Sequence, residues 1–256
     1  MTGGQAPDPA SAEQRDLYEG QYSAPPGEAE RNGAWRALCA QGKADHVAEL
    51  VRSLPSVPST VVEIGCGDGS VLTALAERAV GEVRHGFEIS ERAVAFAASR
   101  PHVDRVEFFD GVDLPVPDKT YDLGVLSHVI EHVPEPALLL REAARACRAL
   151  VVEVPLEDNR SASRPAAARG REELGHLHRF SREAVGALAR GAGLEVRAEV
   201  ADPLPREIHE FWADSTGARA RASAKAAVRR GLFTVAPRVA ERTFTLHYAA
   251  LLTPRP

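Results

Sequence analysis

A glycine-rich turn stands between an apolar run and a helical pattern in the stretch VVEIGCGDGS. Gly65, Gly67 and Gly69 let the backbone turn tightly and approach a ligand, and the start of the following helix offers free N–H groups. Glu88 ends the next apolar run about twenty residues later, where a carboxylate can accept both hydroxyls of a ribose. The turn by itself could be a plain connection, but the turn and the acid together predict a nucleoside cofactor site.

The charge beside the turn narrows the choice of cofactor. A dinucleotide site has the spacing GxGxxG, in which the third glycine packs the helix against the strand. Here Gly69 comes one residue early, and Glu63 precedes the first glycine. A carboxylate there would repel a pyrophosphate and attract a cation. The positive charge of S-adenosylmethionine, with its sulfonium and α-ammonium, therefore suits the turn better.

Strand and helix patterns alternate around these residues. We predict strands at 60–65, 85–90, 106–110, 121–127, 150–155, 194–200 and 241–252. We predict helices between them at 71–79, 91–100, 136–148 and 181–193. This alternation predicts the α/β class, with a doubly wound, Rossmann-like sheet of seven strands that binds its ligand at the carboxyl ends of the strands.

Composition excludes several classes of protein. With 256 residues, 26% of them charged and 44% hydrophobic, the chain can form a core that needs no metal or disulfide. Acidic residues outnumber basic ones by 36 to 31, which disfavours nucleic acid as the main partner. Cys39, Cys66 and Cys147 lack the spacing of a disulfide framework or a thiolate zinc site. Because neither a secretion signal nor an 18-residue apolar run is present, we expect a cytoplasmic protein with no membrane partner.

Four motifs resemble those of one enzyme family: VVEIGCGDG (61–69), GFEIS (86–90), FFDGVDLPVPDKTYDLG (108–124) and LSHVIEHVPEP (126–136). As a set they are similar, over about residues 35–200, to the class I S-adenosylmethionine-dependent methyltransferases, in the small-molecule branch. The resemblance implies S-adenosyl-L-methionine as the cofactor and a methyltransferase core at 55–200 and 241–256. The remaining segments would be a disordered leader at 1–12, an N-terminal helical cap at 13–54 and a helical insertion at 201–240 on the substrate side.

The resemblance also implies where the cofactor lies. Its methionine moiety would be wrapped by four residues of the first motif, Glu63, Gly65, Cys66 and Gly67. Glu88 would hold the ribose, and Ile89 would lie against the adenine. Asp110 would accept a hydrogen bond from the adenine amino group, and the backbone N–H of Gly111 or Val112 would reach the ring.

Histidines are the candidates for acid–base chemistry. Methyl transfer from a sulfonium is an in-line displacement, so the protein mainly supplies alignment and excludes water, and a base is needed only for a protonated acceptor. The resemblance places Ser127 and His128 beside the sulfonium, and His128 is the first candidate base. His176 and His178, two apart on an extended segment, could reach the same pocket as bases or could serve only in loop packing. His132 could share the face of His128 and contact substrate, or could belong to a structural turn.

A divalent-metal site is an alternative use of these side chains. His128, Glu131 and His132, with His176 or His178, have the ligand types of such a site. Similar O-methyltransferases carry two carboxylates and a histidine in the pattern ExxEH and bind magnesium or manganese. In this chain His128 replaces the first acid, and a hard ion prefers oxygen ligands, so we expect no metal.

Scarce aromatic side chains gather in the cap at 13–54. Tyr18 and Tyr22, four residues apart, precede Trp35. The resemblance implies that this segment folds over the cofactor, where the face of Tyr22 could meet the sulfonium and Trp35 the substrate. The alternative is that the aromatics only dock a helix on the edge of the sheet.

The insertion at 201–240 carries the second group of aromatics. Phe211 and Trp212 could line an acceptor pocket or form a dimer contact, and we include His209 beside them as a candidate substrate contact. Basic side chains interleaved with alanine elsewhere in the insertion are typical of a solvated helix face.

The sequence therefore favours an S-adenosylmethionine-dependent methyltransferase that acts on an oxygen or nitrogen atom of a small molecule, in natural-product tailoring. Three alternatives stay open: cyclisation or aminopropyl transfer with the same cofactor, metal-assisted O-methyl transfer, and a binding protein without turnover. The expected partner is a small-molecule acceptor, and a homodimer is a further option.

Overall fold

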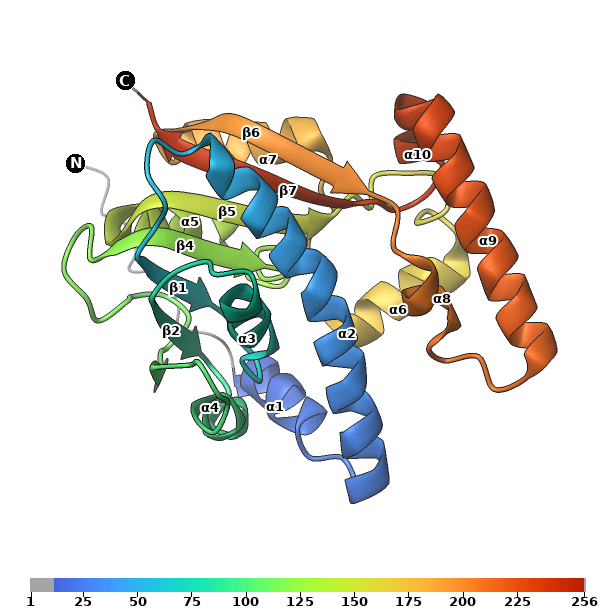
Figure 1. The fold of residues 1–256 in the computed structure, drawn as a ribbon, viewed down its shortest axis with the longest axis horizontal. Helices are drawn as coiled ribbons and strands as arrows, with labels where there is room; N and C mark the ends of the chain where they lie inside the picture. Colours follow the sequence, from blue (N-terminus) through green and yellow to red (C-terminus); the bar gives the residue numbers. More distant parts are fainter. Residues whose placement is uncertain (1–11, 256) are drawn as a thin grey trace.

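The computed structural model describes residues 12–255, and a seven-stranded sheet forms its centre (Figure 1). The strands are β1 (Thr60–Ile64), β2 (Val83–Glu88), β3 (Arg105–Phe108), β4 (Tyr121–Ser127), β5 (Cys147–Pro155), β6 (Leu194–Asp202) and β7 (His247–Pro254). Their order is β3-β2-β1-β4-β5-β7-β6, with β7 antiparallel to both neighbours and the other pairs parallel. The predicted seven-stranded, Rossmann-like α/β fold is confirmed.

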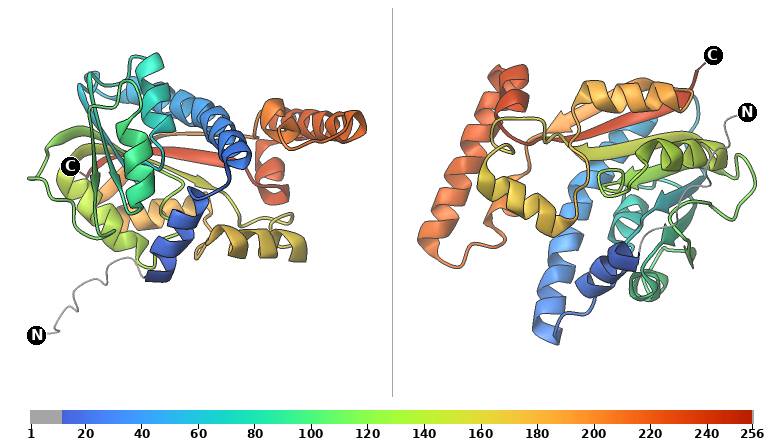
Figure 2. Two further views of the ribbon diagram at one scale, coloured as in Figure 1. Left: turned by 90° about the horizontal axis from the view of Figure 1, so that it is seen from below. Right: turned by 180° about the vertical axis from the view of Figure 1, so that it is seen from behind.

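Helices cover both faces of the sheet, as a doubly wound fold requires (Figures 1 and 2). They are α1 (Ala12–Gln21), α2 (Pro26–Leu50), the 3₁₀ turn η1 (Val51–Ser53), α3 (Ser70–Glu77), α4 (Glu91–Ala98), α5 (Pro136–Ala146), α6 (Pro165–Leu174), α7 (Arg182–Gly191), α8 (Arg206–Glu210), α9 (Thr216–Val235) and α10 (Pro237–Thr243). Apolar residues of α2 and α3 pack on one face of the sheet, and those of α5 and α7 pack on the other. Because β4 and β5 are covered on both sides, their residues form nearly continuous apolar runs.

The N-terminal and insertion segments are helical, as predicted. The predicted leader falls outside the described residues except for Ala12, which begins α1. Helices α8, α9 and α10 lie between β6 and β7, and α9 stands away from the sheet (Figure 2). Only Ala226 of α9 is buried, so most of this helix is a solvated surface. None of the helices between residues 12 and 255 is long and apolar enough to cross a membrane.

The start of the last strand was predicted wrongly. The strand predicted at 241–252 begins at His247, and residues 241–243 belong to α10. Pro237 occupies the first turn of α10, where its fixed φ favours a helix, and Ala240 buries that helix against the core. The residues Thr243, Phe244 and Thr245 are typical of a strand, and for this reason the predicted strand began too early in the chain.

Candidate functional site

The glycine-rich turn joins β1 to α3 at the carboxyl edge of the parallel strands. Gly65 and Gly67 both have positive φ, 75° and 54°, a conformation that favours glycine. A Cβ at Gly65 would lie 2.6 Å from Cγ2 of Val129, and one at Gly67 would lie 2.8 Å from the hydroxyl of Tyr22. The tight turn expected from the glycine spacing is present, and Tyr22 lies directly over it.

Glu88 fixes the turn to the end of β2. Its carboxylate accepts hydrogen bonds from the backbone N–H groups of Gly67 at 2.8 Å, Ile89 at 2.8 Å and Ser90 at 3.0 Å. Burial raises the pKa of Glu88, and the three N–H donors oppose that rise. The acid predicted to hold a ribose therefore also holds the loop against which a nucleoside would lie.

Asp68 anchors the turn to two helices, a role that the sequence motif did not suggest. It accepts hydrogen bonds from the Ser70 hydroxyl at 2.6 Å, from Arg36 of α2 at 2.9 Å and from Arg100, which follows α4, at 2.6 Å. Burial alone would raise the pKa of Asp68, but Ser70 and the two guanidinium groups outweigh it and hold the pKa below its ordinary value. The cap and the core thus meet at this carboxylate.

Glu63 is an almost unpaired acid behind the turn. It is 2% exposed, and its Oε2 has no hydrogen-bond partner among residues 12–255. Burial raises its pKa well above the ordinary value, Asp68 and Glu88 raise it further, and Lys43 opposes them. A cationic ligand at the turn would give this buried carboxyl the countercharge that it lacks.

We predict that Glu63→Gln stabilises the ligand-free protein at high pH. Because the folded chain holds the Glu63 proton more tightly than the unfolded chain, ionisation costs stability as pH rises above about 4.3, and glutamine does not have this cost. Tm should rise by about 2–4 °C at pH 8, while the affinity for S-adenosylhomocysteine falls. Thermal unfolding at pH 5 and pH 8 measures the difference. The exposed Glu77→Gln is the control, and a gain in Tm that is equal at both pH values would contradict the prediction.

Helix α1 lies over the turn and reaches the histidines. The ring of Tyr22 faces the Arg36 guanidinium at 4.8 Å, and Tyr18 meets the ring of His132 edge-on at 5.9 Å. Burial raises the pKa of both tyrosines, with a further contribution from Glu88. Oε1 of Glu19 accepts the N–H of Glu91 at 2.6 Å, which ties α1 to the first residue of α4.

Deleting residues 1–24 should raise KM for S-adenosylmethionine about tenfold, because the deletion removes Tyr18, Tyr22 and the tie to α4. Initial rates at saturating acceptor measure this change. Tyr22→Ala alone should give part of the increase. Unchanged kinetics in both variants would show that the cap is a docked helix without a role at the cofactor.

Glu153 of β5 is surrounded by four polar side chains from three parts of the chain. Its Oε2 accepts a hydrogen bond from the hydroxyl of Ser127 at 3.3 Å. Its Oε1 lies 3.4 Å from Nδ1 of His46, 3.5 Å from Nδ1 of His247 and 3.9 Å from Nε2 of His128. Burial alone would raise the pKa of Glu153, but His247 and His46 hold it well below the ordinary value. Ser127 and His128, predicted side by side at the cofactor, thus share this acid.

His128 has an unusual backbone for a residue with a side chain. Its φ is 57°, and its N–H donates to the carbonyl of Glu153 at 2.9 Å. Nδ1 of the ring lies 3.2 Å from Oε1 of Glu131, and the ring centroid lies 4.6 Å from that of His247. Burial lowers the pKa of His128 well below its ordinary value, and Lys43 and His247 lower it further. A strained residue held in this way is typical of a functional position.

A second polar group joins the turn after β4 to the segment after α6. Donor atoms of Glu131, His132 and His176 lie within 4.8 Å of one another. The carbonyl of Glu131 accepts the N–H of His178, and Nδ1 of His176 lies 2.9 Å from a carboxylate oxygen of Glu157. The side chain of His178 bonds instead to the carbonyl of Val133 at 2.9 Å, so His176 and His178 have different surroundings.

The predicted substrate aromatics form one cluster between α2 and α8. The ring of Trp35 lies 5.1 Å from Phe211 and 5.7 Å from Trp212, measured between centroids. Arg31 covers Trp212 at 4.4 Å. His209 lies on the same short helix, where burial lowers its pKa to about 4 and Arg229 and Lys225 contribute to the shift.

At the predicted adenine end, Asp110 is exposed and caps its own loop. Its Oδ1 accepts the N–H of Val112 at 2.9 Å and that of Asp113 at 3.1 Å. The Val112 N–H, one of the two predicted ring donors, is therefore already in use. Gly111 has a φ of 90°, and Ile89 is half-buried beside Glu88. Cys66 is buried, and burial raises the pKa of its thiol.

Sequence reasoning missed His46, Glu153 and His247. Each carried a weak signal, because each is a titratable residue inside an apolar pattern. The clearest case is LVVEVP, an otherwise apolar strand with one acid, Glu153. A buried acid in a central strand needs polar partners, so an acid in this pattern indicates a polar cluster at the end of the strand.

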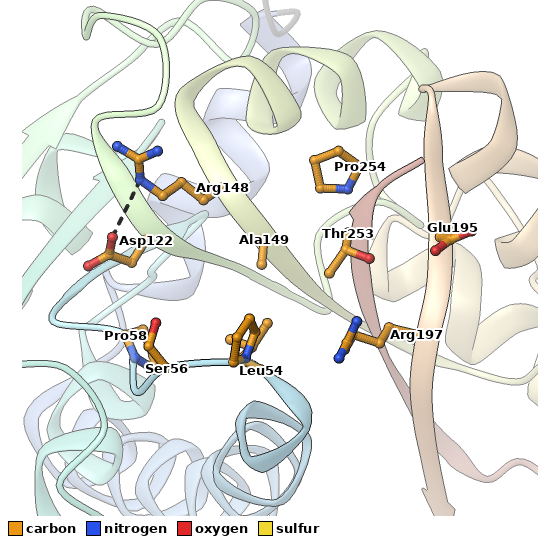
Figure 3. A pocket seen from close by; sticks show the side chains of 11 residues that line it. Leu54, Ser56, Pro58, Asp122, Arg148, Ala149, Glu195, Arg197, Thr253 and Pro254 are labelled. Carbon is orange, nitrogen blue, oxygen red and sulfur yellow. Dashed lines mark ion pairs between the residues drawn. The ribbon is translucent and has the colours of Figure 1, made fainter. Parts of the chain in front are cut away.

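A cavity of about 460 Å³ lies at the other end of the central strands, near the residues where β4 and β5 begin (Figure 3). It is lined by Asp122, Arg148, Arg197 and neighbours from the start of β4, β5 and β6, and Asp122 and Arg148 approach to 3.6 Å. The predicted site residues lie instead at the carboxyl ends of the parallel strands, where doubly wound folds bind their ligands. This cavity is separate from the candidate site.

Comparisons with known proteins give matches in sequence and in fold. A family model described as a methyltransferase domain matches residues 35–199. The chain is 33% identical over 94 residues to 27-O-demethylrifamycin SV methyltransferase of Amycolatopsis mediterranei, covering 34% of each chain. It is 29% identical over 102 residues to demethylmenaquinone methyltransferase of Bacillus licheniformis, covering 37% of this chain and 44% of the relative. The matched part thus spans less than half of these curated relatives.

Among solved structures, the fold is similar to that of geranyl diphosphate C-methyltransferase from Streptomyces coelicolor A3(2), in complex with Mg²⁺, geranyl diphosphate and S-adenosyl-L-homocysteine. The TM-score is 0.66 at 15% identity, over 97% of this chain and 100% of the other. At this identity the likeness shows the fold.

Proposed function

Because this chain belongs to the methyltransferase domain family, we propose that it is an S-adenosyl-L-methionine-dependent methyltransferase that methylates an oxygen or nitrogen atom of a small molecule. The observation that supports it most is the buried carboxyl of Glu63 behind the glycine-rich turn, with Glu88 at the end of the next strand. A sulfonium nucleoside with an α-ammonium group supplies the cation and the ribose that these two acids suit. Similarity to a rifamycin methyltransferase supports natural-product tailoring as the setting.

Different groups of residues would bind the cofactor and the acceptor. The turn at Gly65 and Gly67, with Tyr22 above it, would hold the methionine end of the cofactor. Ser127 and the turn after β4 would stand at the sulfonium. Trp35 and Phe211 would border the acceptor, excluding water from the line between the methyl group and the attacking atom.

We place the base at His176. Its Nδ1 lies 2.9 Å from Oε2 of Glu157, a carboxylate that can accept the Nδ1 hydrogen and so leave Nε2 as the basic nitrogen. A hydroxyl or ammonium acceptor would lose its proton to Nε2 as the new bond to carbon forms and the carbon–sulfur bond breaks, which releases neutral S-adenosylhomocysteine.

The decisive experiment identifies both products. The full chain is incubated with S-adenosylmethionine and a panel of phenolic, alcoholic and amine acceptors, and both products are identified by mass spectrometry. We expect S-adenosylhomocysteine and an acceptor that carries one added methyl group. Methylthioadenosine would indicate aminopropyl transfer, a rearranged acceptor without a methyl group would indicate cyclisation, and cofactor binding without turnover would indicate a binding protein. Each of these outcomes overturns the proposal.

Metal-assisted O-methyl transfer is the second candidate, favoured by the donor group of Glu131, His132 and His176. In that case His176 would be a metal ligand, and the bound ion would supply the activation of the acceptor hydroxyl. Activity that disappears on chelation and returns with Mg²⁺ or Mn²⁺ would support this candidate against the first.

A further inference from the structure

We propose that His128, Glu153 and His247 bind a divalent transition-metal ion. One donor atom from each side chain lies within 4.8 Å of the other two. The ligands come from the turn after β4, from β5 and from the first residue of β7. The metal site considered from the sequence contained neither Glu153 nor His247, so this ligand set is a different one. The proposal does not depend on the methyl-transfer reaction.

The separations of the His247 and His128 nitrogens from Oε1 of Glu153 are longer than hydrogen bonds and close to those of two ligands that share an ion. Its Oε1 lies 3.5 Å from Nδ1 of His247 and 3.9 Å from Nε2 of His128. A charge-assisted hydrogen bond between such groups is about 2.7–2.9 Å long. Two ligands that each bind one tetrahedral ion at about 2.0–2.2 Å stand about 3.2–3.6 Å apart. The His247 separation falls within this range, and the His128 separation is slightly longer, so binding one ion would need a small turn of the His128 ring.

The two oxygens of Glu153 have different partners. Oε2 accepts the hydroxyl of Ser127, and Oε1 is the atom toward which the histidine nitrogens converge. Glu153 is fully buried, and its charge has one close cation in His46, whose pKa is raised to about 10 because Asp202 and Glu153 outweigh the effect of burial. Nε2 of His128 is also buried and has no hydrogen-bond partner within the described part of the chain. An ion between Oε1 of Glu153 and Nε2 of His128 would give that nitrogen a partner.

The backbone fixes the three ligands in place. In the β5–β7 ladder Pro155 pairs with His247 and Glu153 with Ala249, so Glu153 and His247 are diagonal neighbours on one face of the sheet. His128 keeps its positive φ while its N–H bonds to the carbonyl of Glu153. The site is therefore built on strands and not on a loose loop.

His46 supports the site from outside the ligand set. Its Nδ1 lies 3.4 Å from Oε1 of Glu153, and its Nε2 lies 3.6 Å from Oδ1 of Asp202. Outer partners of this kind orient a ligating carboxylate in metal sites. His46 is thus a positioning residue for Glu153.

The donor set indicates the class of ion. Two imidazoles and one carboxylate suit Zn²⁺, Fe²⁺ or Co²⁺ better than Mg²⁺ or Ca²⁺, which prefer oxygen ligands. Three protein ligands leave at least one position for water or for an acceptor oxygen. The side chains of His128 and His247 are 19% and 16% exposed, so an ion could enter from the side of the candidate site.

The test uses the untagged full chain, stripped by chelator and then titrated with Co²⁺ and with Zn²⁺. We expect one ion per chain by elemental analysis and a Co²⁺ absorption spectrum of low coordination number. Glu153→Gln and His247→Gln should weaken Co²⁺ binding about 100-fold or more, and His46→Asn about 10- to 100-fold. His176→Gln, in the neighbouring donor group and paired with Glu157, should leave Co²⁺ binding unchanged.

His128→Asn is the third ligand variant. Asparagine tolerates the positive φ at this position, so we expect the variant protein to fold. Circular dichroism and S-adenosylhomocysteine binding confirm the fold of each variant. The proposal is overturned if the stripped protein takes up neither ion stoichiometrically, or if folded His247→Gln and His128→Asn retain full affinity. It is equally overturned if His176→Gln loses the ion while Glu153→Gln keeps it, because the metal would then belong to the other donor group.

Discussion

Replacing His176 with alanine is expected to lower kcat about 10²- to 10⁴-fold for a hydroxyl or ammonium acceptor, the usual contribution of a general base. Glu157, at 2.9 Å from Nδ1, fixes the ring and its tautomer, so only Nε2 is left to take the proton. The imidazole is held by the segment after α6, whose backbone is bonded to the carbonyl of Glu131. Alanine removes the base without removing these backbone contacts.

Steady-state kinetics at saturating cofactor and acceptor measure this effect, with S-adenosylhomocysteine affinity as the check on the cofactor half of the site. Glu157→Gln should lower kcat about tenfold with KM for acceptor unchanged, and Glu157→Asp should restore part of the loss. His102→Asn, on an exposed loop before β3, is the matched histidine control. If His176→Ala keeps the wild-type kcat for a phenol or an amine, then another group accepts the proton, or the acceptor arrives already deprotonated.

Local patterns were enough for most of the fold. A strand such as β4 is apolar from end to end because it is buried on both faces, and the glycine spacing at 65–69 is needed by the backbone itself. The start of β7 was predicted wrongly because a local sequence pattern does not show which residues the folded chain buries. Ala240 is a weak signal in the sequence, yet its burial holds α10 in place.

The residues proposed to hold the cofactor could be grouped from the sequence because they are close together in the chain or come at motif spacing. Glu88 and Gly67 meet across 21 positions, in the first βαβ unit. The family resemblance implied that the cap covers the turn, and Tyr22 does lie over Gly67. In contrast, two partners of Asp68, Arg36 of α2 and Arg100 after α4, are each 32 positions away, and nothing in the motif predicts them.

The histidine half depends on topology. His46 and Glu153 are 107 positions apart and meet only because α2 packs beside the strand order β4-β5-β7. His247 reaches Glu153 because β7 is antiparallel to β5, a pairing that strand prediction alone does not give. Residues of this kind are found from sequence only by asking which buried charge lacks a partner, as for Glu153 in LVVEVP.

The second large effect is expected at Glu88. Glu88→Gln should weaken S-adenosylhomocysteine binding about 100-fold or more, because the substitution alters the loop and the proposed ribose contact together. The carboxylate uses Oε2 for the N–H of Gly67 and Oε1 for those of Ile89 and Ser90. A glutamine must turn its NH₂ group toward one of these sets of donors, so at least one buried N–H loses its acceptor and faces another donor.

Two contributions therefore add in the Glu88 variant. The turn at Gly67 is released from the end of β2, and the ribose loses an ionic acceptor whose hydrogen bonds are each worth about 1.5–3 kcal/mol. Since 1.4 kcal/mol is about tenfold in affinity, the loss of one such bond and a loosened loop together give the expected factor. Calorimetric titration with S-adenosylhomocysteine measures it. Glu107→Gln, on the adjacent strand β3 and paired with Arg105, is the isosteric control and should bind as the unmodified chain does. A Glu88→Gln protein that binds normally would show that Glu88 only closes the turn and that the nucleoside lies elsewhere along the sheet.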